Sequence, residues 1–164
     1  MNAVKMNVPF FKASIGSEEE KAVIDVMRSG WLTTGSQALA FEKEFSEKVH
    51  SPFALCVNSN TSGMILAMEA LGVNRENAVI TTPYTFVSTA ASARHLGADV
   101  FFADIEKDSY SIDPNSIEKI LKSPDGKKVK AIVPVHIAGN VCNMNAIMNL
   151  AEKCNVKVIE DCAH

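Results

Sequence analysis

From residue 53 onward, short apolar runs alternate with longer stretches in which apolar residues recur every three or four positions. Continuous apolar runs of four or five residues are typical of strands buried on both faces, and the periodic stretches are typical of helices. The alternation therefore predicts an α/β fold, with a mostly parallel sheet covered by helices on both faces. The expected strands are residues 53–57, 78–81, 99–102, 131–135 and 156–160. The expected helices are residues 61–71, 85–95, 114–122 and 144–153.

The first 52 residues have a different pattern, which predicts a short strand or arm followed by two helices. The Ser-x-x-Glu spacing of Ser17–Glu20 is typical of a helix start, because each side chain can satisfy a free backbone amide of the other residue. Gly30–Gly35, which contains the lone tryptophan, is expected to form the loop between the helices. Further along, Asp113–Pro114 is expected to open a helix, and Ser123–Gly126 to form a turn.

Length, composition and charge narrow the class of protein. The chain has 164 residues, 47% of them hydrophobic, and carries neither repeats nor a linker, so we expect one domain over residues 1–164. A net charge of −3 does not indicate the excess of positive charge that is typical of proteins that bind nucleic acid. Because no apolar stretch is long enough to span a bilayer and no targeting signal is recognisable, we expect a cytoplasmic protein. The four cysteines form no CxxC pair, which favours free, buried thiols.

Two segments that follow expected strands carry candidate binding groups. Asn58–Gly63 is a turn of small polar residues that opens a helix, where free amides and the hydroxyls of Thr61 and Ser62 favour an anion such as phosphate. The turn lacks the lysine of a P-loop and the GxGxxG of a dinucleotide site, and it also fits an ordinary capped helix start. Phe86, after the next strand, fits either stacking on a planar ring or packing in the core.

The end of the chain carries a third candidate group. Asp161 follows an expected buried strand, and a buried carboxylate needs a cationic or hydrogen-bonded partner. A helix N-cap is the alternative role for Asp161. Cys162 and His164, taken with His136 and Cys142, match no zinc spacing, so no metal site is predicted. An α/β protein normally continues past such a strand into a loop and helix, so the fold is expected to be truncated.

Several motifs occur together and in order along the chain. They are Gly30–Gly35, Thr61–Ser62, Val79–Phe86, Asp104, Tyr110–Pro114, Ala131–His136 with Gly139, and Glu160–His164. In this order and spacing, the motifs resemble the DegT/DnrJ/EryC1/StrS family of pyridoxal-phosphate (PLP)-dependent sugar aminotransferases over essentially the whole chain. The resemblance implies a fold type I large domain, like that of aspartate aminotransferase. Residues 1–164 would be its amino-terminal part, with the carboxy-terminal domain absent.

The resemblance also implies roles for residues that bind the cofactor. Thr61 and Ser62 match the positions that hold the phosphate, and Phe86 matches an aromatic residue that stacks on the pyridine ring. Asp161 matches the carboxylate that pairs with the protonated ring nitrogen, and His164 matches a Gln or His beside the ring oxygen. A protonated ring accepts electrons from the substrate when the α proton leaves.

Other positions bear on the substrate or depart from the family pattern. Thr33 and Thr34 fall near the sugar site. Asn60 stands where family members often have glycine, and Asn143 and Asn145 stand where they often have acidic residues. The lysine that forms the Schiff base in the family lies beyond the Asp161 motif, and no lysine of this chain occupies its position.

The function implied is transfer of an amino group from an amino acid, with glutamate as the expected donor, to a nucleotide-linked keto-sugar. The full-length protein is expected to be a homodimer, and residues 1–164 alone are expected to be inactive because they lack the lysine. Three alternatives stay open at this point. They are a PLP-dependent sugar dehydratase of the same family, a non-catalytic cofactor-binding half-domain, and a flavodoxin-like binder of phosphate or nucleotide.

Overall fold

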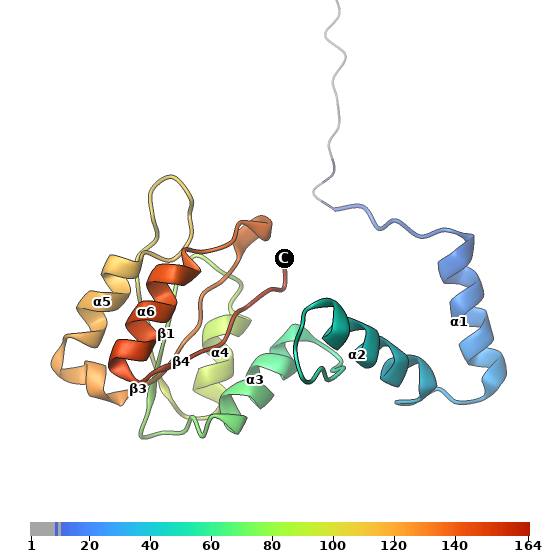
Figure 1. Ribbon diagram of the computed structural model, residues 1–164, viewed down its shortest axis with the longest axis horizontal. Helices are drawn as coiled ribbons and strands as arrows, with labels where there is room; N and C mark the ends of the chain where they lie inside the picture. The colour runs from blue at the N-terminus through green and yellow to red at the C-terminus, as the bar shows by residue number, and fades with distance from the viewer. Residues whose placement is uncertain (1–8, 10) are drawn as a thin grey trace, which may run out of the picture. The chain divides into compact units, whose positions relative to one another are not determined.

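The computed structural model describes residue 9 and residues 11–164 (Figure 1). The described residues form two compact units, divided between Cys56 and Val57. Most of the strand or arm expected at the N-terminus lies outside the described residues, and residues 11–16 have no regular secondary structure. A single domain over residues 1–164 stays a prediction. No helix in the described part of the chain is long and apolar enough to cross a membrane.

The first unit contains helices α1 (Ser17–Ser29) and α2 (Ser36–Lys48). The predicted capping residues are wrong by one position, because Gly16 is the N-cap and its N–H donates to Glu19 Oε2 at 2.7 Å. Gly30 ends α1 as predicted, with a φ of 73° that favours glycine and an N–H that donates to the carbonyl of Met27.

The second unit is built on a four-stranded parallel sheet of order β2-β1-β3-β4. The strands are β1 (Ala78–Thr81), β2 (Asp99–Phe102), β3 (Val129–Ile132) and β4 (Lys157–Val158). The α-helices are α3 (Asn60–Ala70), α4 (Ser88–His95), α5 (Pro114–Leu121) and α6 (Met144–Cys154). Helix α5 begins as predicted: Asp113 accepts a hydrogen bond from the Asn115 N–H at 2.9 Å, and Pro114 occupies the first helical position.

Both faces of this sheet are covered by helices, as the apolar runs predict (Figure 1). Successive side chains of a strand point to opposite faces, so β1 contributes to two cores. Ile80 packs with Ile117 and Ile147 of α5 and α6. Val79 packs in the other core with Met68 of α3 and Ala93 of α4. The two cores fix the ends of the strands, from which the candidate site residues project.

The strand expected over residues 53–57 is wrong. These residues belong to no strand, and no described residue pairs with them across a β-ladder. Phe53 and Leu55 are 85% and 74% exposed. An apolar run becomes a buried strand only when a neighbouring strand and a covering layer are available, and the described residues provide neither for this segment.

The cysteines also differ in part from the expectation. All four are free, as expected, but Cys142 is buried whereas Cys56, Cys154 and Cys162 are exposed.

The turn after α5 has room only for glycine at position 126. The predicted turn is a 3-10 helix, Pro124–Lys128, in which Gly126 is buried. A Cβ atom at Gly126 would lie 2.1 Å from the carbonyl oxygen of Leu121. We expect Gly126→Ala to lower the free energy of unfolding by about 2 kcal/mol, because overpacking against backbone forces the turn to move. Urea denaturation measures this change. Gly63→Ala is the matched control and should be neutral or stabilising, since its Cβ would meet only Val57 Cγ2, at 3.4 Å. Equal effects of the two substitutions would refute the prediction.

Candidate functional site

A pocket of about 320 Å³ lies in the second unit, where the carboxyl ends of the parallel strands meet. In open α/β sheets this edge is the usual place for ligands. Four segments supply its walls: the start of α3, the residues from the end of β1 to the first residue of α4, the residue Val135 after β3, and the residues after β4. The lining residues are Asn60, Thr61, Thr85, Phe86, Ser88, Val135, Asp161, Ala163 and His164. Its volume falls in the range typical of small-molecule sites.

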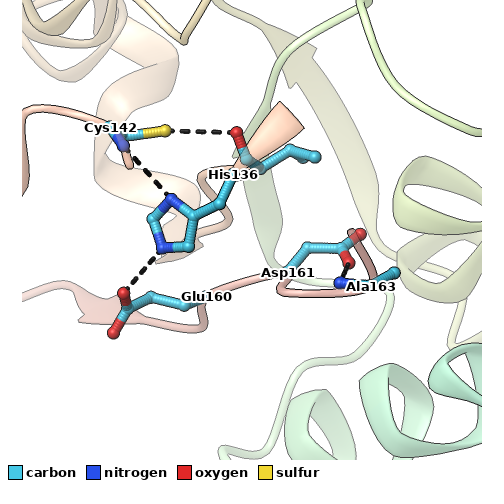
Figure 2. Close-up of polar contacts among 6 residues, drawn as sticks. His136, Cys142, Glu160, Asp161 and Ala163 are labelled. Carbon is cyan, nitrogen blue, oxygen red and sulfur yellow. Dashed lines mark hydrogen bonds and ion pairs between the residues drawn. The ribbon is translucent and has the colours of Figure 1, made fainter. Parts of the chain in front are cut away.

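Asp161 is the buried charge of this pocket. The residue is 3% exposed, and its backbone forms a parallel bridge with Val135 that continues the pairing of β3 and β4. Its Oδ1 accepts hydrogen bonds from Asn60 Nδ2 at 2.9 Å and from the Ala163 N–H at 3.3 Å, the latter drawn in Figure 2. Its Oδ2 accepts from Thr89 Oγ1 at 2.8 Å. Asp161 is therefore a buried, hydrogen-bonded carboxylate.

The hydrogen bonds around Oδ2 have a fixed direction. An ionised carboxylate only accepts, so the Thr89 hydroxyl donates its proton to Asp161. The Thr85 hydroxyl, 2.8 Å from Thr89 Oγ1, must then donate to Thr89. Since a carboxylate oxygen can accept two hydrogen bonds, Oδ2 keeps one acceptor position that no described protein group fills. Asp161 thus offers the pocket a buried negative charge with one open acceptor position.

Thr89→Val tests this arrangement, because valine keeps the shape of threonine and removes only the hydroxyl. We expect the affinity of the pocket for a cationic ring nitrogen to fall about tenfold, as one hydrogen bond to a charged group is lost. Titration with PLP measures this change. Thr81→Val, at an equally buried threonine of β1 outside the pocket lining, is the control and should leave the affinity unchanged. An unchanged affinity in Thr89→Val would contradict the role given to its hydroxyl.

The turn before α3 is both a capped helix start and a set of free donors. Ser59 is the N-cap and its Oγ accepts from the Ser62 N–H at 3.2 Å. The Ser62 hydroxyl donates to Asn58 Oδ1 at 2.7 Å, and Ser62 does not line the pocket. Thr61 does line it, and its N–H and hydroxyl have no hydrogen-bond partner among the described residues. The structure thus brings Thr61, and not Ser62, to the pocket; a phosphate contact by Ser62 stays a prediction.

Phe86 and His164 supply the other walls. Phe86 is 73% exposed, so it does not pack in the core, and its ring lines the pocket. His164 Nδ1 accepts a hydrogen bond from the Ala138 N–H at 3.4 Å. Neutral His164 therefore carries its proton on Nε2, which makes that atom a donor. A planar ring with an oxygen substituent suits these two side chains.

His136 joins the segment after β3 to the segment that carries Asp161 (Figure 2). Its imidazole is almost buried; Nδ1 accepts from the Cys142 N–H at 3.2 Å, and Nε2 lies 2.8 Å from Glu160 Oε2. Burial raises the pKa of the Cys142 thiol, which stays protonated and donates to the Val135 carbonyl at 3.2 Å. These bonds hold the backbone on either side of the Val135–Asp161 bridge.

The same histidine belongs to a group that resembles a metal site. Potential ligand atoms of His136, Glu160 and Cys162 lie within 4.8 Å of one another. Because Nδ1 of His136 accepts from a backbone N–H, the neutral ring carries its proton on Nε2, the atom that faces Glu160. A protonated nitrogen cannot bind a metal ion. The hydrogen bonds therefore favour a structural role for this group, and the absence of a metal stays a prediction.

Thr33 and Thr34 lie in the first unit. Thr33 lines a cavity of about 130 Å³ there with Trp31, whose Nε1 donates to the Thr34 carbonyl at 2.9 Å. A role for these two residues at the sugar stays a prediction.

Sequence reasoning missed three residues of the site: Asn60, Thr89 and His136. Asn60 drew notice only as a departure from a family pattern, and Thr89 stands in a run of small residues without a distinguishing signal. For His136 the sequence suggests only a possible metal ligand and the last position of the Ala131–His136 motif. Their roles depend on which segments meet in space, and spacing along the chain does not reveal this.

The parallel sheet and the pocket at its carboxyl edge, with a buried carboxylate and an exposed aromatic ring in its lining, define an α/β protein with a small-molecule-sized pocket. The chain belongs to the DegT/DnrJ/EryC1/StrS aminotransferase family, whose sequence model matches residues 13–164. The resemblance drawn from the motifs is thereby confirmed, and aminotransferases of this family use PLP.

Three relatives illustrate the match. The spore coat polysaccharide biosynthesis protein SpsC of Bacillus subtilis is 40% identical over 157 residues, which cover 96% of this chain and 39% of SpsC. An aminotransferase from Psychrobacter cryohalolentis is 37% identical with a TM-score of 0.87, over 95% of this chain and 40% of that one. Spr1654 of Streptococcus pneumoniae, assigned as a sugar aminotransferase and solved in its PLP form, is 28% identical with a TM-score of 0.88, over 97% and 43%. The chain thus spans about two-fifths of these proteins.

Proposed function

We propose that residues 57–164 bind PLP at the Asp161 pocket, and that the protein containing them transfers an amino group from an amino acid to a nucleotide-linked keto-sugar. The observation that carries this proposal is the open acceptor position on Oδ2 of the buried Asp161 carboxylate. A buried carboxylate is stable there only with strong hydrogen-bond or cationic partners, and a protonated ring nitrogen supplies the missing one. Family membership and neighbours solved in PLP and PMP forms support the same cofactor.

Each wall of the pocket has a role in this proposal. Thr61, with its free N–H and hydroxyl at the start of α3, binds the phosphate. The Phe86 ring covers one face of the pyridine, and His164 donates to the ring oxygen. Asp161 holds a proton at the ring nitrogen. When bound, PLP supplies an electron-accepting ring that stabilises the negative charge left when the substrate loses its α proton.

The pocket as described contains no amine that could attach the cofactor covalently or move the substrate proton. No lysine is among its lining residues. We therefore propose that residues 1–164 alone hold PLP through phosphate, stacking and Asp161, and do not turn over. Glutamate as the donor, a homodimeric full-length protein with shared active sites, and a place in polysaccharide biosynthesis, as the name of SpsC suggests for that relative, belong to the same proposal.

PLP titration of the chain, followed by absorbance, tests the first half. Saturable binding that is lost in Asp161→Ala supports the pocket, whereas no binding contradicts it. For the second half, the complete polypeptide is incubated with PLP, glutamate and a nucleotide-linked keto-sugar. Mass spectrometry then distinguishes an amino-sugar from a deoxy-sugar, which would indicate the dehydratase. If the complete polypeptide binds PLP but forms neither the amino-sugar nor the deoxy-sugar, it is a cofactor-binding protein without catalytic activity.

A further inference from the structure

The Asn60 side chain connects two parts of the pocket that are far apart in the sequence. Its backbone is the first residue of α3, directly before Thr61, and its side-chain Nδ2 donates to Asp161 Oδ1 at 2.9 Å. An ionised carboxylate only accepts hydrogen bonds, so the nitrogen of the Asn60 amide must be the atom that faces it. The two residues are separated by 101 positions. One hydrogen bond therefore joins the turn at Thr61 to the carboxylate.

This bond also decides which carboxylate oxygen stays open. Asn60 Nδ2 and the Ala163 N–H together fill both acceptor positions of Oδ1, and Asn60 makes the shorter contact. Thr89 fills one position of Oδ2. Asn60 is the only described side chain that donates to Oδ1, so it limits rotation of the carboxylate about its last bond. The open acceptor position is thereby kept on Oδ2.

We infer that Asn60 is a positioning residue that fixes the Asp161 carboxylate relative to the Thr61 turn. The distance between these two groups is thereby matched to the distance between the ring nitrogen and the phosphate of the cofactor. The inference rests on the proposed function, because it assumes that PLP occupies this pocket. A residue without a side-chain amide, such as glycine or alanine, could not make this contact. The positioning contact thus depends on the residue that this chain carries.

The test compares wild type, Asn60→Ala, Asn60→Asp and the control Asn145→Asp by titration with two probes, PLP and pyridoxal. Asn145 is exposed near the start of α6 and outside the pocket, so it reproduces the charge change alone. Asn60→Ala should raise the dissociation constants of both probes about tenfold, because a hydrogen bond to a charged group is lost. Pyridoxal has no phosphate, and its loss of affinity therefore reports on Asp161.

Asn60→Asp adds a second measurement, the pH dependence of the affinity for pyridoxal, which a merely structural role of Asn60 would not change. At neutral pH it places a second carboxylate against Asp161, and the two repel; as pH falls, a shared proton restores a hydrogen bond between them. The affinity of Asn60→Asp for pyridoxal should therefore be lowest at neutral pH and approach that of wild type as the pH is lowered. The pyridoxal dissociation constant of Asn60→Ala, divided by that of wild type, should not change with pH in this way.

The outcomes separate this inference from the proposed function. Wild type that binds neither probe overturns both. Wild type that binds both, with Asn60→Ala equal to Asn145→Asp, overturns the role of Asn60 and leaves the proposed function standing. Loss of PLP affinity with unchanged pyridoxal affinity also overturns the inference, because Asn60 would then act on the phosphate turn and not on Asp161.

Discussion

Replacing Asp161 with asparagine should weaken PLP binding by at least about a hundredfold, the effect expected when one partner of a buried charged pair is removed. Asparagine has nearly the same shape but only one acceptor oxygen. If that oxygen stays with Asn60 and Ala163, an NH2 group replaces Oδ2 and faces the ring nitrogen of the ligand with another donor. Under the proposed function, loss of the proton at the ring nitrogen should also abolish most of the transamination rate of the complete protein.

Absorbance titration with PLP measures the first effect, and the rate of amino-sugar formation measures the second. Asp108→Asn is the control, because Asp108 is exposed and lies outside the pocket. It should bind PLP as the wild type does. Wild-type affinity in Asp161→Asn would show that the cofactor does not pair with this carboxylate, and the proposed function would lose its main support.

Replacing His136 with alanine should lower the free energy of unfolding by about 3 kcal/mol, since it leaves a buried N–H without a partner and removes the packing of the ring. The Cys142 N–H loses its acceptor, and Glu160 loses its link to the segment after β3. Both losses loosen the backbone around the Val135–Asp161 bridge. PLP affinity should therefore fall as well, although His136 does not line the pocket.

Urea denaturation and PLP titration of the same preparations test this prediction. His136→Asn should recover part of the stability, because its side-chain oxygen can accept from the Cys142 N–H as Nδ1 does. His95→Ala is the control: His95 is exposed at the end of α4, and its removal should change stability by less than about 0.5 kcal/mol. A loss no greater in His136→Ala than in His95→Ala would refute the structural role of His136.

The sequence predicts those parts of the fold in which the residues of a single segment determine its secondary structure. Strands β1 and β2 have the predicted bounds, although only β1 is buried throughout and β2, at the edge of the sheet, is partly exposed. Residues 53–57 carry an equally apolar run and form no strand, because a strand also requires a neighbour. Strand β3 begins two residues earlier than expected, and its predicted end at Val135 survives only as the bridge to Asp161.

The residues of the candidate site also fall into two groups: those that a local motif predicts and those that only contacts in space reveal. Asp161, Thr61, Phe86 and His164 were found through motifs, and the structure brings them to one pocket. Ser62 belongs to the same motif, yet its hydroxyl serves the cap of α3. The side chains that donate to Asp161 come from α3 and α4, and no local pattern distinguishes Thr89 from the small residues around it.

The 101-residue separation of Asn60 and Asp161 also bears on how the protein is made. Synthesis proceeds from the N-terminus, and α3 with the Thr61 turn leaves the ribosome long before Asp161 is added. During that interval a nascent chain can offer the phosphate turn but no partner for a ring nitrogen. Under the proposed function, PLP therefore cannot stabilise the partly synthesised sheet through this carboxylate until Asp161 has been added.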